Sequence, residues 1–271
     1  MELSFYAAPG PLTELTGEQA AMVRGLSDDA VELCRAVQGL LIAPGDAFGA
    51  GLSEARLTER NTRPATALLQ QALELDASPL DHPRSTHHRV VGTCRHYAVL
   101  ATAFLRAAGF PARARCGFAS YFVPSKHVDH WIAEHWDVDE DRWVRIDAEI
   151  LGTATVARPH DLRPGEFLTG GESWATVRTG ALDAMDFGVF GTENWGPGEI
   201  RGNLMRDLAS LHKIETLPWD EWGPMNDSYE GRTDEHFDQL MDEVAIACSG
   251  DDDAALDRTY QQLRVPADLI C

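Results

Sequence analysis

The stretch Val91-Gly-Thr-Cys-Arg-His-Tyr-Ala-Val-Leu-Ala-Thr-Ala-Phe-Leu-Arg-Ala-Ala-Gly-Phe-Pro-Ala-Arg113 contains a glycine turn, a cysteine and a helical pattern. Apolar residues recur at helical spacing from Thr93 to Ala108, and Gly109 followed by Pro111 is a helix-ending signal. We therefore predict a helix that begins at Cys94.

Two interpretations of Cys94 follow from this position. The N-terminus of a helix carries partial positive charge, which stabilises a thiolate and lowers the pKa of a cysteine, so Cys94 is placed to be a nucleophile. Alternatively, Cys94 is a small buried hydrophobe, as free cysteines usually are. A nucleophile needs a base and a third group that orients the base, so the rest of the sequence has to supply both.

A β-hairpin pattern downstream supplies these two groups. Asp129–Trp136 and Arg142–Asp147 resemble strands, and the turn-like segment 137–141 separates them. His130 begins the first strand and Asp147 ends the second. In an antiparallel pair these two side chains lie near the same end of the hairpin.

Three motifs in this region resemble those of the transglutaminase-like superfamily of papain-like cysteine enzymes. They are Gly92-Thr-Cys-Arg95, His130-Trp-Ile-Ala-Glu134 and Trp143-Val-Arg-Ile-Asp147, in family order and with family-like spacing. The resemblance implies an α+β fold in which a nucleophile helix packs on an antiparallel β-sheet. It also implies three catalytic residues: Cys94, His130 and Asp147.

Two other histidines compete for the role of base. Strand side chains alternate, so His130 and Glu134 share a face while His135 points the other way, and we favour His130. His96 lies about 200° round the helix from Cys94, which favours a packing or hydrogen-bonding role.

Charge and composition exclude several classes of function. The 271 residues include 23 Lys and Arg against 43 Asp and Glu, a formal charge of -20 that repels phosphate backbones and anionic lipid. We therefore expect no nucleic-acid partner and no membrane partner. Without a signal-peptide pattern or a long apolar run, we expect a cytoplasmic protein. The cysteines are Cys34, Cys94, Cys116, Cys248 and Cys271. They lack a C-x-x-C spacing, which argues against a disulfide scaffold and against a zinc site.

Residues 1–84 are predicted to form a mostly helical lead-in. Ser27-Asp-Asp29 caps one helix that Pro44-Gly45 stops, and a second helix follows Pro64. The segment Gly45–Arg63 between them is predicted to be a surface loop. Three histidines in the following connector are predicted to be solvated and not to bind metal: His82, His87 and His88.

Residues 85–165 are predicted to form the catalytic core. After the helix, Ala112–Phe122 alternates like a half-buried strand. Arg113 and Arg115 share one face, either as contacts for an anionic substrate or as solvated or ion-paired side chains, and the second interpretation is favoured. Cys116 on the other face is predicted to lie in the core.

Residues 166–271 are predicted to form a partly irregular, partly helical extension. The segments Phe167–Trp174 and Gly202–Gly223 resemble the C-terminal part of a group of bacterial transglutaminase-like proteins. Helices are predicted over 203–213, 233–248 and 252–263. Four tryptophans could line a substrate cleft or pack within this extension, and packing is favoured: Trp174, Trp195, Trp219 and Trp222.

The expected activity is acyl transfer on an amide or ester carbonyl of a peptide, protein or small-molecule donor. The Cys94 thiolate attacks, His130 moves the proton and Asp147 orients the imidazole, and an amine or water resolves the acyl-enzyme. A peptidase or amidase would use the same residues, and a non-catalytic binding module could retain them as architecture. No EF-hand loop occurs, so activity without metal or cofactor is expected. Oligomeric state is left open.

Overall fold

The structure, a computed structural model, describes residues 2–250, 252–263 and 265–269. The chain divides into two compact units. The first, here called the Cys94 unit, comprises Glu2–Ala114 and Ile132–Leu162. The second, the His130 unit, comprises Arg115–Trp131 and Arg163–Ile270.

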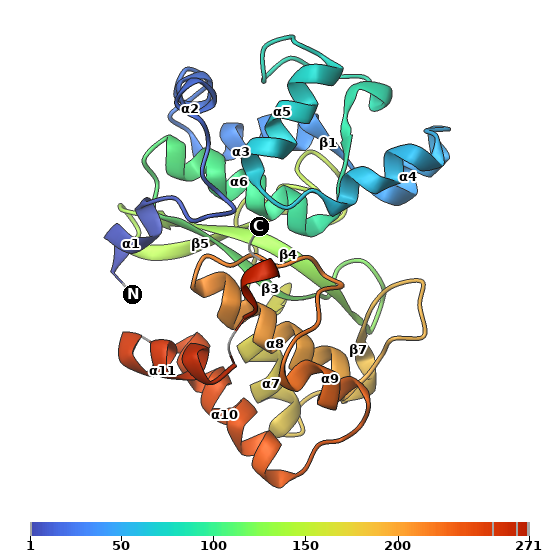
Figure 1. Cartoon of the computed structure of the whole chain (residues 1–271), viewed down its shortest axis with the longest axis vertical. Helices are drawn as coiled ribbons and strands as arrows, with labels where there is room; N and C mark the ends of the chain where they lie inside the picture. Colours follow the sequence, from blue (N-terminus) through green and yellow to red (C-terminus); the bar gives the residue numbers. More distant parts are fainter. Residues whose placement is uncertain (1, 251, 264, 270–271) are drawn as a thin grey trace. The chain divides into compact units, whose positions relative to one another are not determined.

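Helices dominate the Cys94 unit (Figure 1). Its α-helices are α1 Leu3–Ala7, α2 Gly17–Arg24, α3 Ala30–Leu40, α4 Pro44–Gly49, α5 Ala65–Leu75 and α6 Cys94–Ala107. The predicted helix after Ser27 is α3, whose N-cap Asp29 accepts hydrogen bonds from the backbone N–H groups of Val31 and Glu32 at 2.8 and 2.9 Å. The helix predicted after Pro64 is α5.

The prediction of a surface loop over Gly45–Arg63 is wrong. This segment contains most of α4 and a 3-10 helix, Glu54–Asn61. Pro44 does not stop α3, which ends at Leu40; it occupies the first turn of α4, where a proline costs no hydrogen bond. Between the two helices, β1 (Leu41–Ile42) pairs in parallel with β2 (Val90–Val91).

Helix α6 is the centre of the core of the Cys94 unit. It packs against α2, α3 and α5, and its residues from Arg95 to Arg106 are all buried. Phe104 and Leu100 belong to one apolar cluster with Ala133 and Ile146 of the hairpin. The helix predicted to begin at Cys94 is thus confirmed, and it is fixed in place by apolar packing on several sides.

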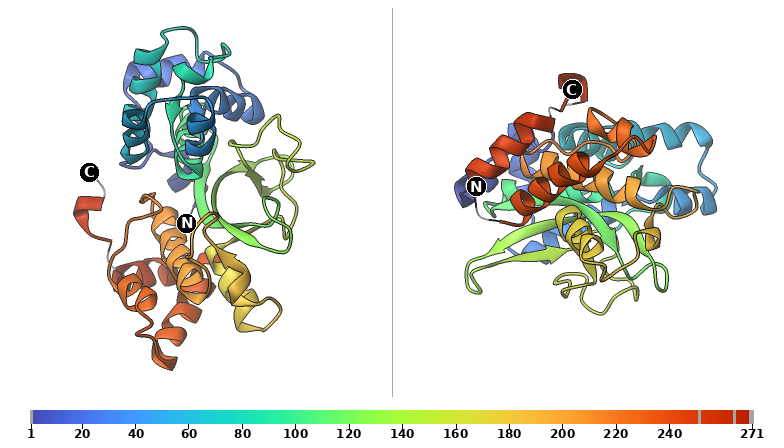
Figure 2. Two further views of the ribbon diagram at one scale, coloured as in Figure 1. Left: turned by 90° about the vertical axis from the view of Figure 1, so that its right-hand side faces the viewer. Right: turned by 90° about the horizontal axis from the view of Figure 1, so that it is seen from below.

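The strands form a curled, mostly antiparallel sheet (Figure 2) in the order β5-β4-β3-β6, with β7 parallel to β4. They are β3 Ala112–Ala119, β4 His127–Asp137, β5 Arg142–Ile146, β6 Phe167–Thr169 and β7 Phe187–Gly188. The predicted hairpin is β4–β5, with Ala133 opposite Ile146 and Asp137 opposite Arg142. The architecture is α+β, as predicted.

The described residues of the His130 unit add further α-helices (Figure 1). They are α7 Gly170–Arg178, α8 Pro197–Leu211, α9 Pro224–Tyr229, α10 Glu235–Ser249 and α11 Asp253–Leu263. Helix α8 packs against α7, α9 and α10. It begins six residues before the predicted start at 203, because Pro197 suits the first turn of a helix.

The tryptophans of this unit differ in their surroundings. Trp174 is buried, and its indole N–H donates to Asp242 at 2.7 Å. Trp222 is also buried, whereas Trp219 is 43% exposed. Trp174 and Trp222 therefore serve packing, as predicted.

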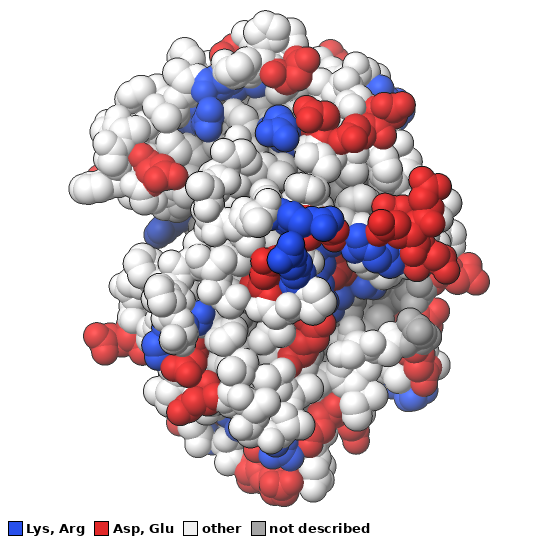
Figure 3. Space-filling model, turned by 180° about the vertical axis from the view of Figure 1, so that it is seen from behind, with Lys and Arg blue, Asp and Glu red and all other residues white. Residues whose placement is uncertain are grey.

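The surface carries both signs of charge. Figure 3 shows several patches of acidic side chains on one face of the molecule, with basic side chains between them. Among the described residues, no helix combines the length and the apolar character that crossing a membrane requires.

Candidate active site

Cys94 is the first residue of α6 and is partly exposed. The preceding Thr93 carbonyl accepts hydrogen bonds from the backbone N–H groups of His96 at 2.8 Å and Tyr97 at 3.4 Å. Across a planar trans peptide the N–H points opposite to the carbonyl, so the backbone N–H of Cys94 points out of the helix N-terminus. This orientation suits a donor for an oxyanion that forms next to the cysteine sulfur.

His96 holds the turn before Cys94. Its Nδ1 accepts a hydrogen bond from the Thr93 backbone N–H at 3.0 Å, and its side chain is fully buried. A Cβ atom on Gly92 would lie 2.8 Å from His96 Cβ, so this close packing needs a glycine. Burial, aided by the charge of Arg95, lowers the pKa of His96 to about 3. His96 is therefore a neutral capping residue, which confirms the predicted hydrogen-bonding role.

Asp147 directly follows β5 and is buried. Its backbone N–H donates to the Pro159 carbonyl at 2.8 Å. One carboxylate oxygen, Oδ1, accepts a hydrogen bond from the backbone N–H of Glu149 at 3.0 Å. These bonds tie the end of the hairpin to the irregular segment that follows it.

Glu149 is an acid that the sequence analysis missed. One of its carboxylate oxygens lies within 4.8 Å of Cys94 Sγ. The pKa of Tyr97, one helical turn after Cys94, is raised well above its usual value, first by burial and next by the charge of Glu149, with Asp147 also contributing. Both carboxylates therefore lie close enough to act on the first turn of α6. The available signal was the position of Glu149, two residues after Asp147.

His130 lies on β4 within the His130 unit and is 3% exposed. The rings of Phe122 and Tyr121 stand edge-on to it, with centroids 5.0 and 6.1 Å away. The preceding residue, Asp129, accepts a hydrogen bond from Asn203 Nδ2 at 2.6 Å. Burial raises the pKa of Asp129, although the charge of Arg206 and then the hydrogen bond from Asn203 partly offset this effect.

His135 lies far from Cys94. It belongs to the Cys94 unit, where its ring stands edge-on to Phe110 just beyond the C-terminal end of α6, with 5.9 Å between the centroids. It also lines a hollow of about 630 Å³ there, together with Ala108 and Val144. Because α6 spans 14 residues, its two ends are roughly 20 Å apart. His135 is therefore at the wrong end of the helix to act on Cys94.

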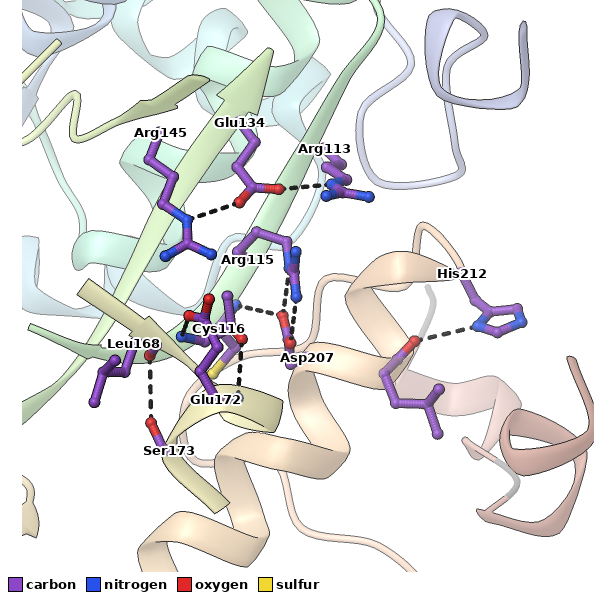
Figure 4. A network of polar contacts seen from close by, with 12 residues as sticks. Arg113, Arg115, Cys116, Glu134, Arg145, Leu168, Glu172, Ser173, Asp207 and His212 are labelled. Carbon is purple, nitrogen blue, oxygen red and sulfur yellow. Dashed lines mark hydrogen bonds and ion pairs between the residues drawn. The ribbon is translucent and has the colours of Figure 1, made fainter. Parts of the chain in front are cut away.

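The two arginines of β3 are ion-paired (Figure 4). Within the Cys94 unit, Arg113 Nε donates to Glu134 at 2.6 Å, and Arg145 Nε donates to the other oxygen of that carboxylate at 3.1 Å. Within the His130 unit, Arg115 donates to both oxygens of Asp207, each at 2.8 Å. The ion-paired interpretation is confirmed for both arginines, and Cys116 is buried as predicted.

The predicted site residues are thus distributed over both units. Cys94 and Asp147 lie in the Cys94 unit, together with Glu149, and His130 lies in the other unit on a strand that runs through both.

A cysteine that begins a helix, followed along the chain by a hairpin bearing a histidine and an aspartate, is the order of groups expected of a cysteine-dependent acyl-transfer domain. Residues 62–148 match the model of the transglutaminase-like superfamily, and this part of the chain belongs to that superfamily. The match contains Cys94, His130 and Asp147. The match ends at residue 148, before the segments Phe167–Trp174 and Gly202–Gly223. The resemblance of these two segments to bacterial transglutaminase-like proteins therefore stays a prediction. Comparisons with curated proteins and with solved structures gave no match.

Proposed function

We propose that this protein is a cysteine-dependent acyltransferase that works through a thioester acyl-enzyme. The observation that carries the proposal is the position of Cys94 at the start of a buried helix, inside the segment that matches the transglutaminase-like superfamily. The partial positive charge of the helix N-terminus favours a thiolate at this position. The outward-pointing backbone N–H of Cys94 is the first oxyanion donor.

In the proposed reaction the Cys94 thiolate attacks the carbonyl carbon of an amide or ester. His130 gives a proton to the leaving amine or alcohol, and Asp147 fixes the imidazole tautomer. The position of the two residues on the hairpin supports this assignment: Asp147 directly follows β5, which pairs with β4 as far as Ala133 opposite Ile146, and His130 lies on β4 three residues before Ala133. The distance of His135 from Cys94 removes its main rival.

The second half of the reaction distinguishes two candidate functions. Attack by an amine on the thioester gives transamidation or amide formation, and attack by water gives hydrolysis, as in a cysteine peptidase or amidase. The superfamily match supports either outcome. We propose a peptide, protein or small-molecule acyl donor, and a reaction without metal or cofactor. We also propose a cytoplasmic location, where a nucleophilic cysteine such as Cys94 would be kept reduced.

Labelling with iodoacetamide tests whether Cys94 is a nucleophile. The other described cysteines are buried, so mass spectrometry of the labelled peptides should find Cys94 modified first. The rate should stay appreciable below pH 7, because the helix N-terminus and an imidazolium both favour the thiolate, and Asp147→Ala should reduce it there. A single titration near the ordinary cysteine pKa of about 8.5, unchanged by Asp147→Ala, would refute the proposed site.

Turnover is tested with 4-nitrophenyl acetate as the acyl donor. Cys94→Ser should abolish the burst of nitrophenolate, because the hydroxyl is almost never ionised at neutral pH. His130→Ala should be nearly as severe, and Asp147→Asn milder. A non-catalytic binding module would show no burst in the wild-type protein and would react with iodoacetamide no faster than glutathione does.

A further inference from the structure

The side chain of Asn203, on α8, joins two strands of the His130 unit. Its Nδ2 group donates to the carbonyl of Gly117 in β3 at 3.0 Å and to Oδ1 of Asp129 in β4 at 2.6 Å. Because Asn203 is only 2% exposed, solvent water does not compete for its amide. Asp129 directly precedes His130, so this amide fixes the part of β4 that carries the proposed acid–base residue.

Arg206 sets the orientation of that amide. Its Nη1 donates to Asn203 Oδ1 at 3.2 Å, so the Nδ2 group has to face the two strands. Arg206 is itself buried, and it also donates to the Tyr229 hydroxyl and to the Asp220 carbonyl, each at 3.1 Å. A Cβ atom on Gly202 would collide with the Tyr229 hydroxyl and lie 2.9 Å from Arg206 Nη1, so the network also needs this glycine.

The bond to Asp129 acts on His130 through the strand. Side chains of neighbouring strand residues point to opposite faces, so those of Asp129 and His130 lie on opposite faces of β4. A bond that holds Asp129 to α8 therefore resists rotation of the strand about its own axis, and such a rotation would displace the imidazole. A displacement of about 1 Å in a group that takes part in the reaction can cost about a hundredfold in rate.

Charge also couples Asp129 to its neighbour. Burial raises the pKa of Asp129, whereas the charge of Arg206, the hydrogen bond from Asn203 and the charge of His130 lower it, in that order. The carboxylate of Asp129 in turn favours the imidazolium form of His130. An experiment on this network has to separate the effect of the hydrogen bond from that of the charge.

We propose that Asn203 is a positioning residue for His130, which acts through the hydrogen bond from its amide to Asp129. The inference rests on the proposed function and deepens it, because it names the group that holds the acid–base residue in place. Asn203 and Arg206 lie outside residues 62–148, which match the superfamily model. The proposal therefore gives a task to the part of the chain that follows the match.

The test is a double-mutant cycle on the rate at which iodoacetamide alkylates Cys94 at pH 6. A displaced imidazolium stabilises the thiolate less, and a rise of one unit in the pKa of Cys94 lowers the thiolate fraction about tenfold. Asn203→Ala should therefore lower the rate about tenfold, whereas in a His130→Ala background it should have no further effect. The control Trp174→Phe, which removes the hydrogen bond to Asp242 between α7 and α10, should leave the rate unchanged.

Variants of Asp129 test the same bond from its other end and carry the test if Asn203→Ala does not fold. Asp129→Asn keeps an oxygen that accepts from Asn203, whereas Asp129→Ala removes it. Asp129→Asn should keep most of the wild-type rate, and Asp129→Ala should match Asn203→Ala. An equal loss in both Asp129 variants would assign the effect to the charge and overturn the inference.

Two further outcomes would overturn the positioning role. One is an Asn203→Ala protein whose Cys94 is alkylated as fast as in the wild type. The other is a double variant that is alkylated much more slowly than His130→Ala, because the effect of Asn203 would then not pass through His130. A rate that His130→Ala leaves unchanged overturns the proposed function itself.

Discussion

Replacement of Arg115 by methionine should destabilise the protein strongly. Its guanidinium donates to both oxygens of Asp207, each at 2.8 Å, and the two side chains are 4% and 0% exposed. Without Arg115, the buried Asp207 keeps one described donor, the backbone N–H of Cys116 at 3.2 Å. Removing one partner of a buried ion pair typically costs about 3 to 5 kcal/mol, because the other charge stays buried without compensation.

The free energy of unfolding in urea, followed by circular dichroism at pH 7, measures this cost. The control is Arg232→Met, which breaks an ion pair with Asp227 whose side chains are 56% and 50% exposed, and which should cost less than about 1 kcal/mol. The double variant Arg115→Met with Asp207→Leu should recover much of the loss, because it removes the unpaired charge. If Arg115→Met costs no more than Arg232→Met, the reasoning is wrong. If Arg115→Met leaves the free energy of unfolding unchanged but lowers the rate of acyl transfer, Arg115 contacts the substrate instead.

Further predictions concern pH, capping, the choice of histidine and metal. Burial raises the pKa of Glu199 from 4.5 to about 7, so the folded chain keeps a proton that the unfolded chain releases in this window, and the free energy of unfolding falls as the pH rises through it. The free energy of unfolding in urea, measured at pH 5 and at pH 8, should differ less in Glu199→Gln than in the wild type. The substitution should reduce this difference by at most about 3 kcal/mol. His96→Ala should cost about 1 kcal/mol, whereas His96→Gln should cost less because glutamine can accept the Thr93 N–H in the same way; thermal unfolding that ranks them oppositely contradicts the capping role. His130→Ala should abolish the nitrophenolate burst and His135→Ala should spare it, and the reverse result at matched stability would refute the strand-face argument. Excess chelator should leave the burst unchanged; full loss that added calcium restores would show that the site needs metal.

Local patterns explain why much of the segment that matches the transglutaminase-like superfamily was predictable. Helix α6 shows apolar periodicity and ends with a glycine and a proline, and the β4–β5 hairpin shows strand character on both sides of a polar turn. Both signals depend on residues a few positions apart. The segment Gly45–Arg63 lacked such a pattern, and Pro44-Gly45 is compatible with the end of one helix and with the start of another.

The sequence alone determined the helix that begins at Cys94 and the hairpin that follows it, because helix spacing, capping and turn chemistry are properties of neighbouring residues. Only the tertiary structure decided which groups meet across long separations. Arg115 pairs with Asp207, 92 positions away, and Glu149 reaches Cys94 because the segment after β5 packs against the first turn of α6. Side-chain partners of this kind depend on how elements pack, and no periodicity in the chain records them.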